Sequence, residues 1–366
     1  MKIGIDYRPA LGEFAGIGYY CQGLIEGLSK LKIENTFYLY IDKNLRGDHL
    51  NFGKIIIKNH NLFHPGILSD LALGRIDLFH STHSLIVPSF SKKTVVTIHD
   101  ISALTFQDAQ RKVKIISKLL LIRAIKNSQK IIVPSIATKE EILKLTDLER
   151  TKIVVIPEAA DSNFYPRSEK EIKFVREKYN LSKDYILFNS TIEPRKNVLR
   201  LIHAYNYLRK NKKITEELVL IGKPGWGYGS GLEIIKNLNL TDQIKLLGWV
   251  KEDDLPALYS GAKIFVYPSL QEGFGLSILK AFKTQIPVAV SNIEVLKEIC
   301  ADAAVFFDPY RIESIAESIF KLLKDNKLAN ELIKRGENRV KNYNFKKMAK
   351  ATFEVYQSVL NNFKLI

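Results

Sequence analysis

The fold of this chain is decided by the stretch Ser269–Leu270–Gln271–Glu272–Gly273–Phe274–Gly275–Leu276–Ser277–Ile278–Leu279–Lys280–Ala281. The apolar run Ala262–Tyr267 before it predicts a buried strand, and the glycines after Glu272 predict a turn that leads into a helix. Glu272 is therefore expected at the carboxyl end of a strand. The amide groups at the start of a helix favour phosphate, and a carboxylate beside them can accept hydrogen bonds from hydroxyl groups. A sugar joined to a diphosphate would present both.

The rest of the chain alternates short apolar runs with longer helical patterns. The first series of expected strands is Lys2–Asp6, Thr36–Ile41, Lys54–Ile57, Leu78–Phe79, Thr94–Ile98, Lys130–Val133 and Ile153–Ile156. The second series is Tyr185–Asn189, Glu217–Ile221, Ile244–Leu246, Lys263–Tyr267 and Val288–Val290. Strands separated by helices of about 10–15 residues predict parallel sheets covered on both faces. Two series therefore predict an α/β chain of two doubly wound, Rossmann-like domains, 1–165 and 166–344, with the boundary in the segment Pro157–Pro166.

The composition favours a soluble protein with an anionic partner. The 55 Lys and Arg residues exceed the 39 Asp and Glu residues, which gives a formal net charge of +16. Such a surface attracts nucleotides, nucleic acid or an acidic membrane face, although a merely solvated basic surface is an equally good interpretation. The two cysteines have no CxxC or histidine companion, which argues against structural zinc or disulfides and favours a reducing cytosol. Met1–Asp6 is typical of a strand rather than of a signal peptide, and no run approaches the roughly 20 apolar residues of a membrane span.

A histidine and an aspartate, His99 and Asp100, follow the expected strand Thr94–Ile98. Ligands of doubly wound sheets bind at the carboxyl ends of the strands, so this pair is a candidate for orienting a substrate hydroxyl or for acid–base work. A satisfied His–Asp hydrogen bond without a catalytic role is the alternative. His80 and His83 are expected to be ordinary polar residues of an earlier loop.

Two adjacent cations, Arg195 and Lys196, follow the first strand of the second series and precede a helix. Cations at a helix N-terminus oppose the helix dipole, so they call for an anion beside them. Arg binds phosphate as a fork and Lys as a compact charge, which suits the two phosphates of a nucleotide sugar. A solvated basic helix start is the alternative.

Three glycine-containing loops are weaker candidates, because each one alone is explained by a plain turn between a strand and a helix. They contain Gly16 and Gly18 after the first strand, Gly222 in the segment Leu220–Gly227, and Val250 after Leu247–Trp249. The first loop lacks the spacing of a dinucleotide-binding motif and of a P-loop. The last two are candidates for the wall of a nucleobase pocket. Their position at strand ends is what makes all three of interest.

In order and spacing, these segments resemble the retaining glycosyltransferases of family 4, which belong to the group 1, mannosyltransferase-like enzymes. The segments that carry the resemblance are GIGYY at 16–20, VTIHD at 96–100, STIEPRKN at 190–197, VLIGKPGW at 219–226, LLGWV at 246–250, YPSLQEGFGLSILKA at 267–281 and SNIEVLKEICADAAVFFDP at 291–309. The resemblance implies a GT-B fold, in which two Rossmann-like domains face each other across a cleft. Domain 1–165 would bind the acceptor, domain 166–344 would bind the nucleotide sugar, and the C-terminal helix, 345–366, would cross back to the first domain.

The resemblance also implies a role for each candidate residue. His99, Lys196 and Glu272 would be catalytic: His99 would contact the donor sugar, Lys196 would hold phosphate with Arg195, and Glu272 would bind sugar hydroxyls. The further donor-binding residues would be Gly16, Gly18, Gly222, Val250, Phe274, Gly275, Leu276 and Lys280. We expect no metal and no other cofactor, because Arg195, Lys196 and the helix N-terminus can neutralise the leaving group. For retaining enzymes of this fold the acceptor attacks from the face that the phosphate leaves, so no protein nucleophile is expected.

Lys280 departs from the family pattern, which has a second glutamate at this position, eight residues after the first. That glutamate accepts hydrogen bonds from the two ribose hydroxyls, whereas an ammonium group has no acceptor. Three interpretations remain open. The enzyme binds ribose more weakly or through another residue such as Glu294 or Glu298, it uses an unusual donor, or the chain is a degenerate, inactive relative.

The expected function is transfer of a hexose, with mannose a mild preference, from a GDP- or UDP-linked donor to a glycan or lipid-linked acceptor with retention, in polysaccharide or lipopolysaccharide biosynthesis. The alternative is a degenerate scaffold or sugar-binding subunit. A nucleic-acid partner is not expected, because no RRM, KH or helix-turn-helix signature accompanies the charge. The segment Arg111–Lys126 predicts a basic amphipathic helix. It is either a core helix with a basic polar face or a surface for anionic lipid, which would place this cytoplasmic protein on the inner face of the membrane.

Overall fold

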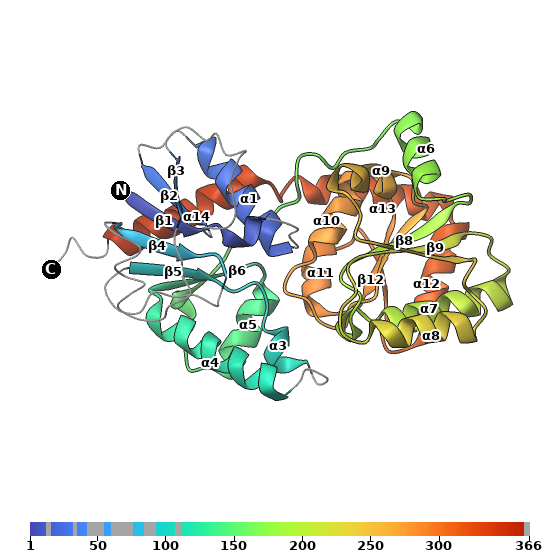
Figure 1. Cartoon of the computed structure of the whole chain (residues 1–366), viewed down its shortest axis with the longest axis horizontal. Coiled ribbons are helices and arrows are strands. Elements are labelled where there is room, and N and C mark those ends of the chain that lie inside the picture. Colours follow the sequence, from blue (N-terminus) through green and yellow to red (C-terminus); the bar gives the residue numbers. More distant parts are fainter. Residues whose placement is uncertain are drawn as a thin grey trace. The chain divides into compact units, whose positions relative to one another are not determined.

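This computed structural model describes residues 1–11, 16–31, 35–41, 55–59, 76–83, 93–106 and 111–361, with 55–59 and 111–113 described by their backbone alone. The chain forms two compact units, each built around its own parallel sheet (Figure 1). Unit 1 contains residues 1–161 and 343–366, and unit 2 contains residues 162–342. The division falls before the boundary expected at 165/166, because the ring of Phe164 packs against Tyr259 of unit 2, with 5.7 Å between the ring centroids.

The described strands of unit 1 form a seven-stranded sheet in the order β3-β2-β1-β4-β5-β6-β7. These strands are β1 (Lys2–Asp6), β2 (Thr36–Ile41), β3 (Ile55–Asn59), β4 (Leu78–Ser81), β5 (Lys93–Thr97), β6 (Lys130–Val133) and β7 (Ile153–Val155). The described helices of this unit are α1 (Gly16–Ser29), α3 (Ser102–Thr105), α4 (Arg111–Asn127), α5 (Ile136–Leu145) and α14 (Phe345–Asn361). All pairings between these strands are parallel, as the alternation of strands and helices predicts.

Helices cover both faces of this sheet. Val95 and Val96 are neighbours on β5, so their side chains point to opposite faces. Val95 belongs to a core formed with α1 and α14, whereas Val96 belongs to a core formed with α4 and α5. The C-terminal helix α14 therefore completes the core of the unit that contains the N-terminus, and α1 and α14 lie side by side in Figure 1.

Unit 2 has a six-stranded parallel sheet in the order β10-β9-β8-β11-β12-β13. Its strands are β8 (Tyr185–Asn189), β9 (Glu217–Ile221), β10 (Ile244–Gly248), β11 (Ile264–Tyr267), β12 (Val288–Ser291) and β13 (Val305–Phe307). Its helices are α6 (Glu169–Lys178), α7 (Val198–Tyr207), α8 (Tyr228–Asn237), α9 (Leu255–Ser260), α10 (Leu276–Lys283), α11 (Glu294–Cys300), α12 (Ile312–Lys324) and α13 (Asn326–Val340). The edge strand β13 is missing from the expected series, because three residues are too short for a periodic signal.

The predicted α/β class, with two doubly wound sheets, is confirmed by these two topologies. In each sheet the first strand in the sequence lies in the interior. The next two strands are added on one side of it, and the chain then crosses over, so that the remaining strands are added on the other side. The crossing point lies between β1 and β4 in unit 1 and between β8 and β11 in unit 2. In open α/β sheets the loops at the carboxyl ends of such a strand pair diverge and leave room for a ligand.

Replacement of Gly27 by Ala should destabilise unit 1, because α1 approaches the backbone of α14 closely at Gly27. A Cβ atom at Gly27 would lie 2.3 Å from the carbonyl oxygen of Phe345 and 2.6 Å from the Cβ of Ala349. We expect Gly27→Ala to lower the free energy of unfolding by about 1–3 kcal/mol. Gly229→Ala in α8 is the control, because nothing lies within 4 Å of its added Cβ. Urea denaturation of both variants checks this; equal stability would refute the close packing of α1 on α14.

Candidate functional site

Arg195 and Lys196 lie on a 3-10 turn, Pro194–Lys196, that follows β8. Asn197 ends this turn in the left-handed conformation, with φ of 60°. Its side-chain amide donates hydrogen bonds to the carbonyl oxygens of Pro268, at 3.0 Å, and Pro309, at 2.7 Å. The turn after β8 is thereby fastened to the loop after β11, and both cations are held at the crossing point of the sheet.

Glu272 lies in the loop after β11 and meets these cations. Its Oε1 pairs with the ammonium group of Lys196 and accepts a hydrogen bond of 2.5 Å from the hydroxyl of Ser269. Its Oε2 lies 3.8 Å from a guanidinium nitrogen of Arg195. Lys196 also donates to the hydroxyl of Tyr267 at 3.2 Å. The structure thus brings together the three charged residues that the sequence singles out in unit 2.

Burial and the neighbouring charges determine the protonation of Glu272, Lys196 and Tyr267. Burial would raise the pKa of Glu272, but the cations Lys196 and Arg195 outweigh it and lower that pKa, so the carboxylate stays ionised. Burial also lowers the pKa of Lys196, and the attraction of Glu272 only partly compensates. Burial followed by the charge of Glu272 raises the pKa of Tyr267 well above its usual range, so the hydroxyl keeps its proton.

The glycines of unit 2 allow close approach of its loops. Gly222 has φ of 146°, and a Cβ atom there would lie 1.8 Å from the carbonyl oxygen of Ser190 in the loop after β8. Its amide donates to the carbonyl oxygen of Gly248, at 2.8 Å, which joins the ends of β9 and β10; Val250 follows, buried. Gly275 has φ of 114° and caps α10, whose first residue is Leu276, while Phe274 is buried.

Lys280, which replaces the family's second glutamate, is buried in α10. Its ammonium nitrogen lies 4.8 Å from the centroid of the Phe164 ring, a cation–π contact. Lys280 therefore packs against the segment that enters unit 2, and its place among the donor-binding residues remains a prediction from the resemblance alone.

His99 lies in unit 1, two residues beyond β5, and is held by three groups. Its Nδ1 lies 2.6 Å from Oε1 of Glu158, and its Nε2 lies 2.9 Å from the carbonyl oxygen of Thr82. The ring of Tyr20 meets it edge to face, with 4.8 Å between centroids. Asp100 instead accepts hydrogen bonds from the backbone and hydroxyl of Ser102, so the strand-end carboxylate that binds His99 is Glu158. The sequence alone does not indicate this role of Glu158, which belongs to the segment expected to separate the two domains.

Gly16 and Gly18 begin α1, and Gly18 is buried in its first turn. The residues 12–15 before them lie outside the described part of the chain. The expectation that His80 is an ordinary loop residue is wrong. His80 is fully buried on β4, where Nδ1 lies 2.6 Å from the hydroxyl of Tyr356 and Nε2 lies 2.8 Å from that of Thr97. The expected strand ends at Phe79, one residue before His80, whereas β4 continues to Ser81.

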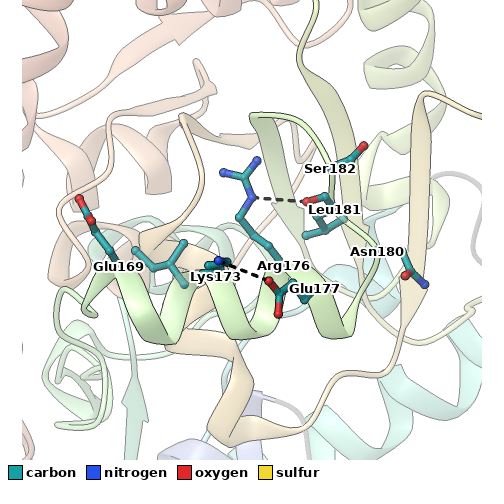
Figure 2. A pocket seen from close by; sticks show the side chains of 8 residues that line it. Glu169, Lys173, Arg176, Glu177, Asn180, Leu181 and Ser182 are labelled. Atoms are coloured by element: carbon teal, nitrogen blue, oxygen red, sulfur yellow. Dashed lines mark hydrogen bonds and ion pairs between the residues drawn. The ribbon is translucent and has the colours of Figure 1, made fainter.

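A surface cavity of about 820 Å³ lies elsewhere in unit 2, along α6 (Figure 2). It is lined by Glu169, Ile172, Lys173, Arg176, Glu177, Asn180, Leu181 and Ser182. Of these lining residues, Arg176 donates a hydrogen bond to the carbonyl oxygen of Leu181, at 3.4 Å. None of the candidate site residues lines it. Among the described residues, no group of three or more His, Cys, Asp or Glu side chains is arranged to hold a metal ion.

Two family models match the chain, "Glycosyltransferase Family 4" over residues 14–164 and "Glycosyl transferases group 1" over residues 169–339. The O-antigen chain mannosyltransferase B of Escherichia coli is 30% identical over an alignment of 380 positions, which covers 98% of this chain and 100% of that protein. The chain belongs to the group 1 glycosyltransferases. The resemblance to the group 1 glycosyltransferases that was inferred from the sequence is thereby confirmed.

Solved structures confirm the GT-B fold of this group 1 glycosyltransferase. The sucrose-phosphate synthase of Thermosynechococcus elongatus matches with a TM-score of 0.79 at 18% identity, over 99% of both chains. HepE of Anabaena, solved in complex with UDP and glucose, matches with a TM-score of 0.76 at 18% identity, over 98% of this chain and 100% of that one.

Removal of the ammonium group of Lys196 should destabilise unit 2, because it leaves Glu272 buried without its nearest cation. We expect Lys196→Met to cost about 3–5 kcal/mol and the double variant Lys196→Met/Glu272→Gln to recover part of that loss. The control is Lys297→Met, which breaks an exposed pair with Glu294 and should cost about 0–1 kcal/mol. Calorimetric unfolding of these variants beside the wild type checks this, and additive losses in the double variant would contradict the pairing.

Proposed function

We propose that this hexosyltransferase moves mannose from a nucleotide sugar to a glycan or lipid-linked acceptor, with retention of configuration, in the synthesis of a surface polysaccharide or lipopolysaccharide. The observation that carries the proposal is the buried contact of Lys196 and Arg195 with Glu272 at the crossing point of the unit 2 sheet. The relative from Escherichia coli, an O-antigen chain mannosyltransferase, supports mannose and the polysaccharide. HepE, which was solved with UDP and glucose, supports a nucleotide sugar as the donor.

The charged group suits a donor that carries both anionic and hydroxyl groups. Arg195 already uses one edge of its guanidinium to bind Glu193, at 2.8 Å, and donates another N–H to the carbonyl oxygen of Gln271, at 3.0 Å. A diphosphate that approaches Lys196 and Arg195 would take over part of their interaction with Glu272. The carboxylate would then be available to accept hydrogen bonds from sugar hydroxyls. Lys196 and Arg195 would thus bind the donor, and by doing so they would free the carboxylate of Glu272 to bind the sugar.

The reaction we propose needs no protein nucleophile. The bond between the anomeric carbon and the phosphate oxygen breaks while the acceptor oxygen forms its bond to the same face of that carbon. The departing phosphate oxygen takes the proton of the acceptor hydroxyl. Lys196 and Arg195 stabilise the negative charge that develops on the leaving phosphate, and we propose that no resident metal ion is required for this step.

The alternative of a degenerate scaffold receives no support from the comparisons, because a relative that covers 98% of this chain is named as a mannosyltransferase. Lys280, which suggested the alternative, lies against Phe164. Glu272 and Lys196, by contrast, are both present and in contact. We therefore favour an active enzyme in which another group contacts the ribose.

We also propose that α4 rests on an anionic membrane surface. Its inner face packs into the core through Leu121, Ala124 and Ile125. Its outer face exposes an apolar stripe consisting of Ile115 (52% exposed), Ile116 (47%), Leu119 (63%) and Ile122 (36%). Lys114, Lys118, Arg123 and Lys126 belong to the same helix, and an apolar stripe among cations is typical of helices that lie in a membrane interface. None of the helices in the described residues is long and apolar enough to span a bilayer.

Loss of Lys196 should abolish most of the transferase activity. We expect Lys196→Ala, assayed well below its melting temperature, to lower kcat about 10²- to 10³-fold, because one preorganised positive charge on the leaving group is lost. Lys263→Ala is the control, since Lys263 pairs with Asp184 at the amino end of the sheet. Donor hydrolysis and transfer would be measured with GDP-, UDP-, ADP- and dTDP-sugars, and the anomer of the product determined by NMR. An inverted product would refute retention, and absence of turnover with every donor would refute the transferase.

Flotation with vesicles that contain phosphatidylglycerol tests the membrane surface. We expect the wild type to float with these vesicles at low salt and Leu119→Glu to remain at the bottom, because the variant places a carboxylate in the middle of the apolar stripe. Phe174→Glu on α6 is the matched control, with a residue of similar exposure, 62%, in unit 2. Failure of the wild type to float, or equal loss in both variants, would overturn the role of α4.

A further inference from the structure

The ring of His99 faces a hydrogen-bond acceptor at each of its nitrogen atoms. Nδ1 lies 2.6 Å from a carboxylate oxygen of Glu158, and Nε2 lies 2.9 Å from the backbone carbonyl oxygen of Thr82. A backbone carbonyl only accepts, so Nε2 must carry a proton. A neutral imidazole has one N–H, and a second proton must then lie between Nδ1 and Glu158. A free imidazole holds a proton more tightly than a free carboxylate by about two pKa units, which places the proton on the ring.

The surroundings of His99 favour the same protonation state. Burial alone would lower the pKa of His99, but the hydrogen bond and charge of Glu158, the carbonyl oxygen of Thr82 and the charge of Asp100 together raise it. The ring of Tyr20 closes a further side and carries no charge, because burial raises the pKa of its hydroxyl and keeps it protonated. The buried carboxylate that touches the ring thus outweighs the cost of a buried cation.

Two further histidines lie near His99 and remain neutral. Burial, followed by the charge of His99, lowers the pKa of His80 to about 3 and that of His83 to about 4. The partners of His80 are the hydroxyls of Tyr356 and Thr97, which can donate or accept and therefore satisfy a neutral ring. His83 faces the charges of Asp6, Arg8 and Asp100, which partly cancel. Of these three histidines, the one in contact with Glu158 carries the charge.

We propose that Glu158 is a positioning residue that holds His99 as an imidazolium ion in a fixed orientation, so that His99 serves the transferase at neutral pH as a cation and not as a proton acceptor. The role of His99 in transfer rests on the proposed function, whereas its charge does not. The contact joins two loops, because His99 follows β5 and Glu158 follows β7, and the two residues are 59 positions apart. Both side chains are nearly enclosed, with 14% and 6% of their surfaces exposed.

The variant E158Q removes the negative charge of Glu158 and keeps nearly the same side-chain shape. The side-chain amide that this variant introduces can donate to Nδ1 of His99, while the Nε2–H still donates to Thr82. A neutral ring then keeps both hydrogen bonds, and the imidazolium loses its stabilising partner. The variant Glu140→Gln is the matched control, because Glu140 pairs with Arg150 on the surface of the same unit.

The ring ¹⁵N resonances of His99, assigned by comparison with His99→Asn, report its charge without any substrate. At pH 7.5 we expect both ring nitrogens of the wild type to carry protons, one of the two to lose its proton in E158Q, and Glu140→Gln to match the wild type. A neutral His99 in the wild type at this pH would overturn the proposal. So would a pH titration of these resonances in which the midpoint of His99 is the same in E158Q as in the wild type. The wild-type spectrum alone decides the charge if E158Q does not fold.

The pH dependence of kcat/KM for transfer tests the consequence for the reaction. We expect the alkaline limb of the profile to move to lower pH in E158Q, with the rate returning toward that of the wild type as the pH falls and the ring regains its proton. A loss of equal size at every pH would show that Glu158 supports only the structure and would overturn its positioning role. Imidazolium resonances in a protein that turns over no nucleotide sugar would refute the proposed function and leave the charge of His99 established.

Discussion

The site of unit 2 depends on one buried ion pair, Lys196 with Glu272. Neither charge could remain in the interior alone, because a buried ion without a partner costs several kcal/mol. The pair forms because β8 and β11 are hydrogen-bonded neighbours in the sheet, although β9 and β10 lie between them in the sequence. Asn197 then fastens the loop after β8 to the loop after β11. The topology of the sheet thus determines which two side chains can neutralise each other.

Both units satisfy their strand-end charges with partners from the protein itself. In unit 2 the partners are Lys196 and Glu272, with Ser269 and Tyr267 around them. In unit 1 the partners are His99 and Glu158. A ligand of either unit therefore exchanges existing hydrogen bonds for new ones and finds donors that are already oriented. Such preorganisation lowers the reorganisation required during reaction, which is the main source of electrostatic stabilisation in enzymes.

Local patterns in the sequence are sufficient to predict the class of fold and the charged residues of unit 2. Strands followed by glycines or by paired cations indicate carboxyl ends of strands, and Glu272, Arg195 and Lys196 all lie there. Contacts between distant segments are not readable in this way. In the sequence, Glu158 is one acid in a proline-containing segment and His80 is one polar residue. Only the fold shows that Glu158 contacts His99 and that β4 buries His80. Lys280 could be recognised as a departure from the family pattern, but its contact with Phe164 depends on the packing of α10.

The assignment of α14 to unit 1 affects the order in which the chain can fold during its synthesis. Unit 2 is continuous from 162 to 342, so all of its strands leave the ribosome before α14 does. The core beneath α1 includes Met348, Phe353 and Tyr356 and stays open to solvent until those residues emerge. Domains are generally completed from the N-terminus onward. Here the order is reversed: the second unit can reach its native state first, while the first exposes the apolar surface beneath α14 until that helix emerges.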